Sequence, residues 1–134
     1  MKITCNIDGS CRINPHGEIG YAYIINLENE ETIEYCNSEP SKHGNTSVVA
    51  EYKAINALLE KLIELKLCEA PIEIRSDSML IYRQFIGNMK RKKGFYIPFS
   101  KETDRLLKRF NNLEVIWVSR DENREADALA ACYY

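Results

Sequence analysis

The feature that most limits how this chain can fold is an 18-residue segment, "VVAEYKAINALLEKLIEL", at residues 48–65. At about 100° per residue its apolar side chains form one stripe, so the segment is expected to be an amphipathic helix that covers a hydrophobic partner. The stripe comprises Val48, Tyr52, Ile55, Leu58, Leu59, Leu62 and Leu65, while Lys53, Asn56, Glu60 and Glu64 are expected to face water. Glu51 projects into the stripe. A carboxylate on a buried face needs a paired cation, several hydrogen bonds or a metal to compensate its charge.

Short alternating segments before this helix predict the first half of a sheet. Residues 3–8, "ITCNID", alternate apolar and polar side chains and end in Asp8, at a turn-prone Asp-Gly-Ser sequence. Residues 21–27 and 32–36 have the composition of two further strands. Because the connections between these three strands are short, we expect an antiparallel meander.

The second half of the chain alternates strands with helices. Residues 72–77, "IEIRSD", repeat the opening pattern and again end in an aspartate, Asp77. The remaining expected elements are helices at about 78–88 and 100–110, a strand at 113–118, and a last helix within "SRDENREADALAACYY". Alternating strands and helices imply parallel strands with crossovers. We therefore predict an α/β fold in which a single domain, residues 1–134, has a mixed five-stranded sheet flanked by helices.

Length and composition exclude several classes of protein. A chain of 134 residues with 45% hydrophobic and 28% charged residues is ordinary for one globular domain. No apolar run approaches the roughly 20 residues needed to cross a bilayer, and the first residues lack the apolar core of a signal peptide. The five cysteines include no C-x-x-C pair, so reduced thiols are expected. We expect a cytoplasmic protein without a membrane partner, and no protein partner is evident.

Charge is distributed unevenly along the chain. The net charge is −2, but residues 83–109 carry nine basic and two acidic side chains, so this segment is +7 and the remainder −9. A basic region beside an acidic remainder suits phosphate contact on one side of the molecule. A run such as "KRKK" is more often only a solvated loop, so alone it does not establish a nucleic-acid partner.

Three carboxylates are candidates for a metal site. In an open α/β sheet, sites gather at the carboxyl ends of strands, where Asp8 and Asp77 are expected. If the helix that carries Glu51 packs over these strands, three acidic groups converge and repel one another unless one is protonated or divalent cations bind. Oxygen ligands of this kind favour magnesium or manganese. For each aspartate alone, a turn or helix-capping role is the simpler interpretation.

Four stretches resemble, in order and spacing, the motifs of type 1 ribonuclease H domains. They are "IDGSCRINPHGEIGYAYII", "TSVVAEYKAINALL", "IEIRSDS" and "IWVSRDENREADALA", the last of which contains an N-x-x-x-D pattern at Asn123 and Asp127. The resemblance covers nearly the whole chain and implies the mixed five-stranded ribonuclease H-like fold. It further implies that Asp8, Glu51, Asp77 and Asp127 hold two Mg²⁺ ions, with Mn²⁺ as a substitute. The implied activity is endonucleolytic hydrolysis of the RNA strand of RNA/DNA hybrids.

The resemblance also implies contacts to the hybrid, whose RNA strand is distinguished by its 2′-hydroxyl groups. The expected nucleic-acid-binding residues are Gly9, Ser10, Cys11, Asn14, Ser47, Lys90, Arg91, Lys92, Lys93 and Arg120. For Cys11, a partly buried small hydrophobic role is an equal alternative. Phe95 and Tyr96 in the basic segment either add an aromatic surface or, together with Ile97 and Phe99, pack into the core.

Two departures from the family pattern bear on activity. Many members carry a histidine in a loop before the last aspartate, whereas the loop here is only "SRDEN", and Arg120 is the candidate substitute as a phosphate contact. Val48 stands where an amide side chain is common and cannot donate a hydrogen bond. The alternative function is therefore a catalytically weak module of the same fold that binds hybrid or double-stranded RNA. Another nuclease of the superfamily is disfavoured by the glutamate on the first long helix.

Overall fold

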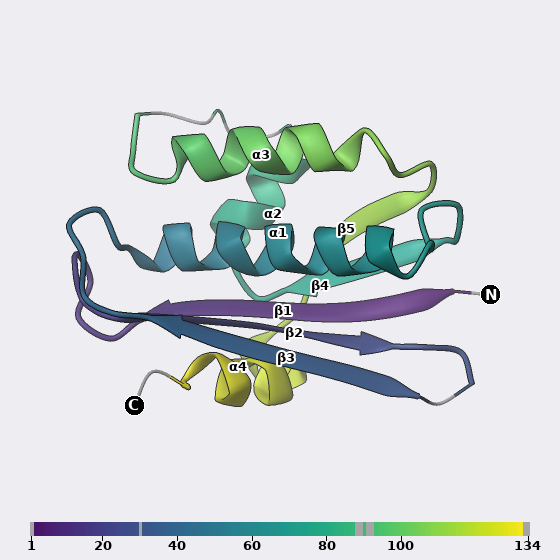
Figure 1. Ribbon diagram of the computed structural model, residues 1–134, viewed down its shortest axis with the longest axis horizontal. Helices are drawn as coiled ribbons and strands as arrows, with labels where there is room; N and C mark the ends of the chain where they lie inside the picture. The colour runs from purple at the N-terminus through teal and green to yellow at the C-terminus, as the bar shows by residue number, and fades with distance from the viewer. Residues whose placement is uncertain (1, 30, 88–89, 91–92, 133–134) are drawn as a thin grey trace.

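A computed structural model describes residues 2–29, 31–87, 90 and 93–132 (Figure 1). The elements are β1 (Ile3–Cys11), β2 (Ile19–Asn26), β3 (Thr32–Glu39), α1 (Ser47–Glu64), β4 (Ile72–Ser76), α2 (Met79–Phe85), α3 (Ile97–Leu107), β5 (Leu113–Trp117), a 3₁₀ turn η1 (Arg120–Asn123) and α4 (Arg124–Ala130). The order of strands and helices is the predicted one, with the short 3₁₀ turn added before the last helix.

The five strands form one mixed sheet in the order β3-β2-β1-β4-β5. β1, β2 and β3 pair antiparallel, whereas β1–β4 and β4–β5 pair parallel. The predicted antiparallel meander followed by parallel strands is thus confirmed. β1 lies at the centre of the sheet, where the two kinds of pairing meet.

Helices cover both faces of the sheet (Figure 1). α1 packs on β1 and β2 with α3 stacked on its outer side, while α4 packs on the opposite face against the same two strands and β3. As a result, β2 is buried from Ile19 to Ile25 without alternation, because both of its faces are covered. None of the helices in the described part of the chain has the length and apolar character needed to span a membrane.

β1 is longer than the sequence pattern predicts, and this changes the setting of Asp8. The strand continues through Cys11 because antiparallel pairing with β2 runs as far as Cys11 opposite Ile19. Pairing with β4 stops earlier, at Asn6 opposite Arg75. The prediction of a turn at Asp-Gly-Ser is therefore wrong. Asp8 lies within β1, where the strand still pairs with β2 but no longer pairs with β4.

The helix boundaries also differ from the predicted ones. α3 begins at Ile97, earlier than expected, since Pro98 is compatible with the first helical turn, and it ends at Leu107. α2 ends at Phe85, and Gly87 beyond it has a left-handed φ of 77°.

α1 buries the middle of the predicted stripe, leaves Val48 half-buried at its start, and also buries a polar residue that was expected to face water. Thr46 caps the helix by accepting a hydrogen bond from the Val49 amide. Asn56 is buried because α3 covers that side of α1, and its side chain donates to the Phe99 carbonyl (3.0 Å) and accepts from Thr103. The prediction that Asn56 faces water is thus wrong, because the periodicity of α1 indicates which side faces the sheet but not that α3 packs on another side.

Candidate active site

Two aspartates meet where β1 and β4 separate. Asp8 lies two residues beyond Asn6, the last residue of β1 that pairs with β4, and Asp77 is the first residue after β4. Parallel neighbours that diverge at their carboxyl ends leave a crevice between them, the usual place for a site in such sheets. The expectation that both aspartates lie at this edge holds, although only Asp77 follows the end of its strand.

Glu51 reaches this edge from α1, on the face of the sheet opposite α4. The close approach of helix and strand depends on Gly9. A Cβ atom on Gly9 would lie 2.4 Å from the Ala50 carbonyl carbon and 2.4 Å from the Glu51 amide nitrogen, closer than nonbonded atoms can come. Gly9 therefore has a packing role, because it brings the Glu51 backbone against β1 beside Asp8.

Asp127 comes from α4, on the opposite face. Its carboxylate lies 3.8 Å from the Arg120 guanidinium, and both side chains are partly or largely exposed. One pocket of about 310 Å³ joins these elements; its lining consists of Asp8, Gly9, Ser10, Glu51, Asp77, Ser78, Arg120 and Asp127. All four carboxylates that the resemblance singled out thus line the same pocket.

The environment of Asp8 favours its protonated form. Burial raises its pKa first, followed by a hydrogen bond with Asp127 and the negative charges of Asp77, Asp127 and Glu51. This crowding has a clear origin, since Asp8 is buried and three further carboxylates line the same pocket. Like charges this close destabilise one another unless one is protonated or a cation binds.

Glu51 is the second carboxyl group of the pocket whose environment disfavours its charged form. Burial raises the pKa of Glu51 to about 7, a hydrogen bond from Ser78 opposes the rise, and the charge of Asp77 adds to it. One of its carboxylate oxygens, Oε2, is fully buried and has no hydrogen-bond partner among the described residues. An unpartnered buried carboxylate oxygen is costly, and the hydrogen bond from Ser78 compensates the Glu51 charge only in part.

The donor set suits a hard divalent cation. Every charged ligand candidate is a carboxylate, and Glu51 Oε2 is an oxygen that lacks a partner. Among the described residues, however, no group of three or more His, Cys, Asp or Glu side chains has the complete arrangement needed to hold a metal ion. The four carboxylates share a pocket of matching chemistry without forming a finished coordination shell.

The expected hybrid-contacting residues near the first loop are arranged in two groups. Gly9 and Ser10 line the pocket itself. Asn14 and Ser47 exchange two hydrogen bonds (3.4 and 3.3 Å) at the surface near the start of α1. Cys11 is half-buried, with its thiol directed at backbone carbonyls, which agrees with its alternative as a small packing residue.

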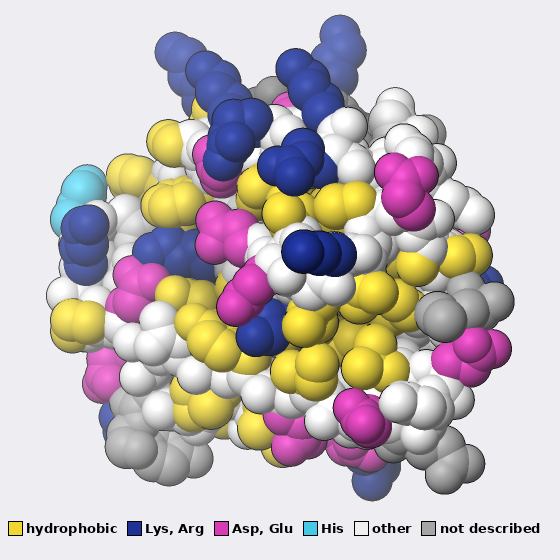
Figure 2. All heavy atoms as spheres, turned by 45° about the vertical axis from the view of Figure 1, so that its right-hand side comes forward, with side chains coloured by type: hydrophobic (Ala, Val, Ile, Leu, Met, Phe, Trp, Pro, Cys, Tyr) yellow, Lys and Arg dark blue, Asp and Glu magenta, His cyan; other side chains and the backbone are white. Residues whose placement is uncertain are grey.

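The basic segment is divided between surface and core. Lys90 and Lys93 are exposed, whereas Arg91 and Lys92 lie outside the described residues. Figure 2 shows further Lys and Arg side chains along the top of the molecule, over α3. Phe95 is exposed and its ring edge packs on the stacked rings of His16 and His43. Tyr96, Ile97 and Phe99 are half-buried, and Tyr96 and Phe99 pack against the core, so the two alternatives each hold for part of the segment.

Two polar residues of this region were not predicted as site residues. Ser78 lines the pocket and hydrogen-bonds Glu51, while also capping α2. Its position directly after Asp77 was a usable signal. Asn123 is only 1% exposed and joins α4 to β1 through a hydrogen bond to the Ile7 carbonyl. The sequence gives its spacing to Asp127 but not its partners on β1.

Comparison with known proteins agrees with this geometry. Residues 6–132 match the reverse transcriptase-like family. LC11-RNase H1, solved in complex with an RNA/DNA hybrid, is 30% identical, with a TM-score of 0.86 over 98% of this chain and 95% of that chain. RNase H1 from the halophilic archaeon Halobacterium salinarum is 26% identical, with a TM-score of 0.84 over 97% and 95% of the two chains. The N-terminal RNase H domain of a Mycobacterium tuberculosis protein is 29% identical, with a TM-score of 0.83 over 96% and 90%.

The mixed sheet, the helices on both of its faces and the similarity to solved RNase H1 structures place this protein in the ribonuclease H class of α/β proteins. The chain belongs to the reverse transcriptase-like family and, within it, is a type 1 ribonuclease H.

Proposed function

We propose that this protein hydrolyses the RNA strand of RNA/DNA hybrids by internal cleavage, with two Mg²⁺ ions held by Asp8, Glu51, Asp77 and Asp127. Mn²⁺ would serve as a substitute. The proposal is supported by the likeness to LC11-RNase H1, which was solved with an RNA/DNA hybrid bound. The observation that carries it is the buried Glu51 Oε2 atom, which has no partner within the described part of the protein.

The residues of the pocket would have separate roles in the reaction. The four carboxylates would bind the cations, and because burial and neighbouring charges raise the pKa of Asp8 in the metal-free protein, cation binding would favour its ionised form. When bound, a pair of divalent cations activates the attacking water and stabilises the departing 3′ oxygen of a phosphodiester. Ser78 would orient Glu51 through their hydrogen bond.

Arg120 would contact a phosphate of the cleaved strand, the role proposed for it in place of a loop histidine. Its side chain is 82% exposed at the pocket edge, and its guanidinium can leave Asp127 at little cost. Among the described residues that line the pocket there is no histidine, since His16 and His43 stack on one another elsewhere. This feature favours the second candidate, a module that binds hybrid or double-stranded RNA and cleaves slowly.

The test is incubation of the purified protein with a labelled RNA/DNA hybrid, an RNA duplex and a DNA duplex, each with Mg²⁺ or Mn²⁺. Asp77→Asn removes one ligand charge, and Asp121→Asn makes the same change on an exposed residue outside the pocket. We expect cleavage of RNA in the hybrid alone, abolished in Asp77→Asn and retained in Asp121→Asn. A folded protein that binds hybrid without cutting it would leave only the binding module.

Metal binding has an independent reporter. Trp117 is the only tryptophan, and its Nε1 atom donates a hydrogen bond to the Asp77 backbone carbonyl (3.2 Å). Titration with Mg²⁺ in the absence of substrate is therefore expected to change the tryptophan fluorescence of the protein. Asp77→Asn should weaken this response, whereas Asp121→Asn should preserve it.

A further inference from the structure

Asp127 sits on an element that is weak by itself. α4 has only seven residues, and isolated helices of that length do not persist in water. The Asp127 side chain is 41% exposed, so its own packing does not hold it firmly. The position of its carboxylate in the pocket it shares with Asp8 therefore depends on how the ends of α4 are held.

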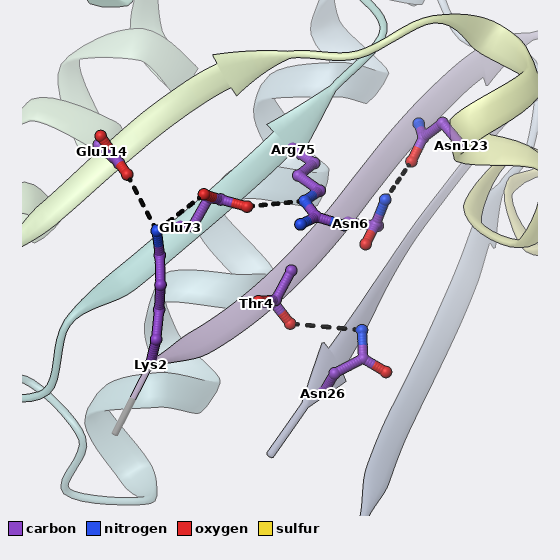
Figure 3. Close-up of polar contacts among 8 residues, drawn as sticks. All are labelled: Lys2, Thr4, Asn6, Asn26, Glu73, Arg75, Glu114 and Asn123. Atoms are coloured by element: carbon purple, nitrogen blue, oxygen red, sulfur yellow. Dashed lines mark hydrogen bonds and ion pairs between the residues drawn. The ribbon is translucent and has the colours of Figure 1, made fainter. Parts of the chain in front are cut away.

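The first tie is a buried amide at the start of α4. Asn123 directly precedes the helix, and its Nδ2 atom donates to the Ile7 backbone carbonyl (2.9 Å). Its Oδ1 atom accepts from Asn6 Nδ2 (2.9 Å), a contact visible in Figure 3. Both polar atoms of Asn123 are thus used, and both partners lie on β1 immediately before Asp8.

The second tie is at the other end of the helix. Ser10 Oγ donates to the carbonyl of Ala130, the last residue of α4 (3.3 Å). Between the two ties, Ala126 and Ala130 are fully buried, and their small side chains let α4 lie close to the sheet. Residues 6, 7 and 10 therefore flank Asp8 on β1, while residues 123 and 130 flank Asp127 on α4.

We propose that Asn123 is a positioning residue, which together with Ser10 clamps α4 to β1 and sets the separation of Asp8 and Asp127. The inference rests on the proposed function, because it gives this separation a purpose in cation binding. Groups that orient metal ligands act through such fixed hydrogen bonds, and their loss typically lowers metal affinity or activity about 10- to 100-fold.

The chain offers a chemically matched control. Asn26 on β2 also donates to a β1 backbone carbonyl, that of Thr4 (3.4 Å), and also accepts from a side chain, that of Thr32 (3.5 Å). Figure 3 shows the Asn26 contact beside that of Asn6. Asn26 is exposed and does not line the carboxylate pocket, so Asn26→Ala removes the same kind of contact without touching α4.

The experiment compares wild type, Asn123→Ala, Asn6→Ala and Asn26→Ala by calorimetric titration with Mn²⁺ alone, by kcat and KM on hybrid, and by thermal unfolding. For Asn123→Ala we expect Mn²⁺ affinity and kcat to fall by about 10-fold or more, with KM for hybrid nearly unchanged. Asn6→Ala keeps the bond to Ile7 and should show a smaller loss of the same kind. Asn26→Ala should match wild type in Mn²⁺ affinity and kcat.

A folded Asn123→Ala protein with wild-type Mn²⁺ affinity would overturn the proposal, even if its Tm were lower. If Asn123→Ala does not fold, wild-type Mn²⁺ affinity in Asn6→Ala has the same meaning. Failure of the wild-type protein to bind Mn²⁺ and to cut hybrid would instead overturn the proposed function, and the positioning role with it. The two failures are distinguishable, because the first is a result for the variants alone and the second is a result for the wild-type protein.

Discussion

Two largely buried glutamates, Glu51 and Glu73, show opposite solutions to the same electrostatic problem. Glu73 on β4 lies between Lys2 (3.0 Å) and Arg75 (2.7 Å), and these cations lower its pKa (Figure 3). Glu51 on α1 has a buried oxygen without a hydrogen-bond partner among the described residues, and burial raises its pKa to about 7. Two cations compensate the first carboxylate, whereas the second has only the hydrogen bond from Ser78 within the part of the chain that the structure describes.

The two glutamates therefore differ in what compensates their charge. Lys2 and Arg75 are 54% and 42% exposed, so the Glu73 network is partly solvated and stabilises the sheet only modestly. Because burial raises its pKa, Glu51 is expected to lower the stability of the metal-free protein where it is ionised, which fits the role proposed for it as a cation ligand. Burial alone would not distinguish the two residues; the presence or absence of cationic partners does.

The largest expected effect is on cleavage. Glu51→Gln should reduce hybrid cleavage by at least about 100-fold, because loss of a ligand exceeds the loss of its supporting contacts. Glu73→Gln makes the same chemical change on β4 and should leave the rate near that of wild type. The measurement is the initial rate of hybrid cleavage by each variant at saturating Mg²⁺. Equal rates in the two variants would contradict the role proposed for Glu51.

The second effect is on the pH dependence of stability. Without metal, the folded protein holds the Glu51 proton up to about pH 7, whereas the unfolded chain releases it near 4.5. The folded state thus binds more protons in this window, so Glu51 makes stability fall as pH rises, by roughly 3 kcal/mol. Urea unfolding in EDTA at pH 5 and pH 8 measures the fall.

Glu51→Gln is the control for this pH effect, because it cannot ionise. It should be more stable than the metal-free wild type at pH 8 and close to it at pH 5. Mg²⁺ should raise the stability of the wild type at pH 8 but have less effect on the variant. An identical pH slope in both proteins would show that Glu51 is compensated within the protein.

Gly9→Ala tests the packing that brings Glu51 to the pocket. The added Cβ atom would meet the backbone of Ala50 and Glu51, which cannot rotate away, so we expect roughly 1–3 kcal/mol of destabilisation and weaker Mg²⁺ binding. Gly87→Ala adds a Cβ atom in open space, at a left-handed φ of 77°. It should lower stability through backbone strain and leave Mg²⁺ binding unchanged, as measured by unfolding and metal titration.

The smallest effect is on the compensated glutamate. Because its pKa is lowered in the folded state, Glu73 stabilises the protein above about pH 4.5, and this contribution is lost as pH falls through its folded-state pKa. Glu73→Gln should cost about 1 kcal/mol or less at pH 7, and this cost should shrink as pH falls through the folded-state pKa of Glu73. A cost that grows toward low pH would reverse the assignment of the two glutamates.

Much of the fold could be predicted from the sequence because local periodicity reports which faces are buried. The alternation in "ITCNID" and "IEIRSD" and the stripe of α1 were sufficient to predict the mixed sheet and its order of elements. The errors lie where tertiary contacts override the local pattern. β1 runs past Asp8 because β2 continues to pair with it, and Asn56 is buried because α3 covers α1.

The candidate site divides in the same way. The sequence by itself determined which carboxylates exist and that Glu51 stands on an apolar face, since both follow from residue identity and helical period. Only the tertiary structure decided that Glu51 Oε2 lacks a partner among the described residues while Glu73 has two cationic ones, and that Asn123 joins α4 to β1. Compensation of a buried charge depends on atoms from distant segments brought within a few ångströms, and such distances are set by packing rather than by any local pattern.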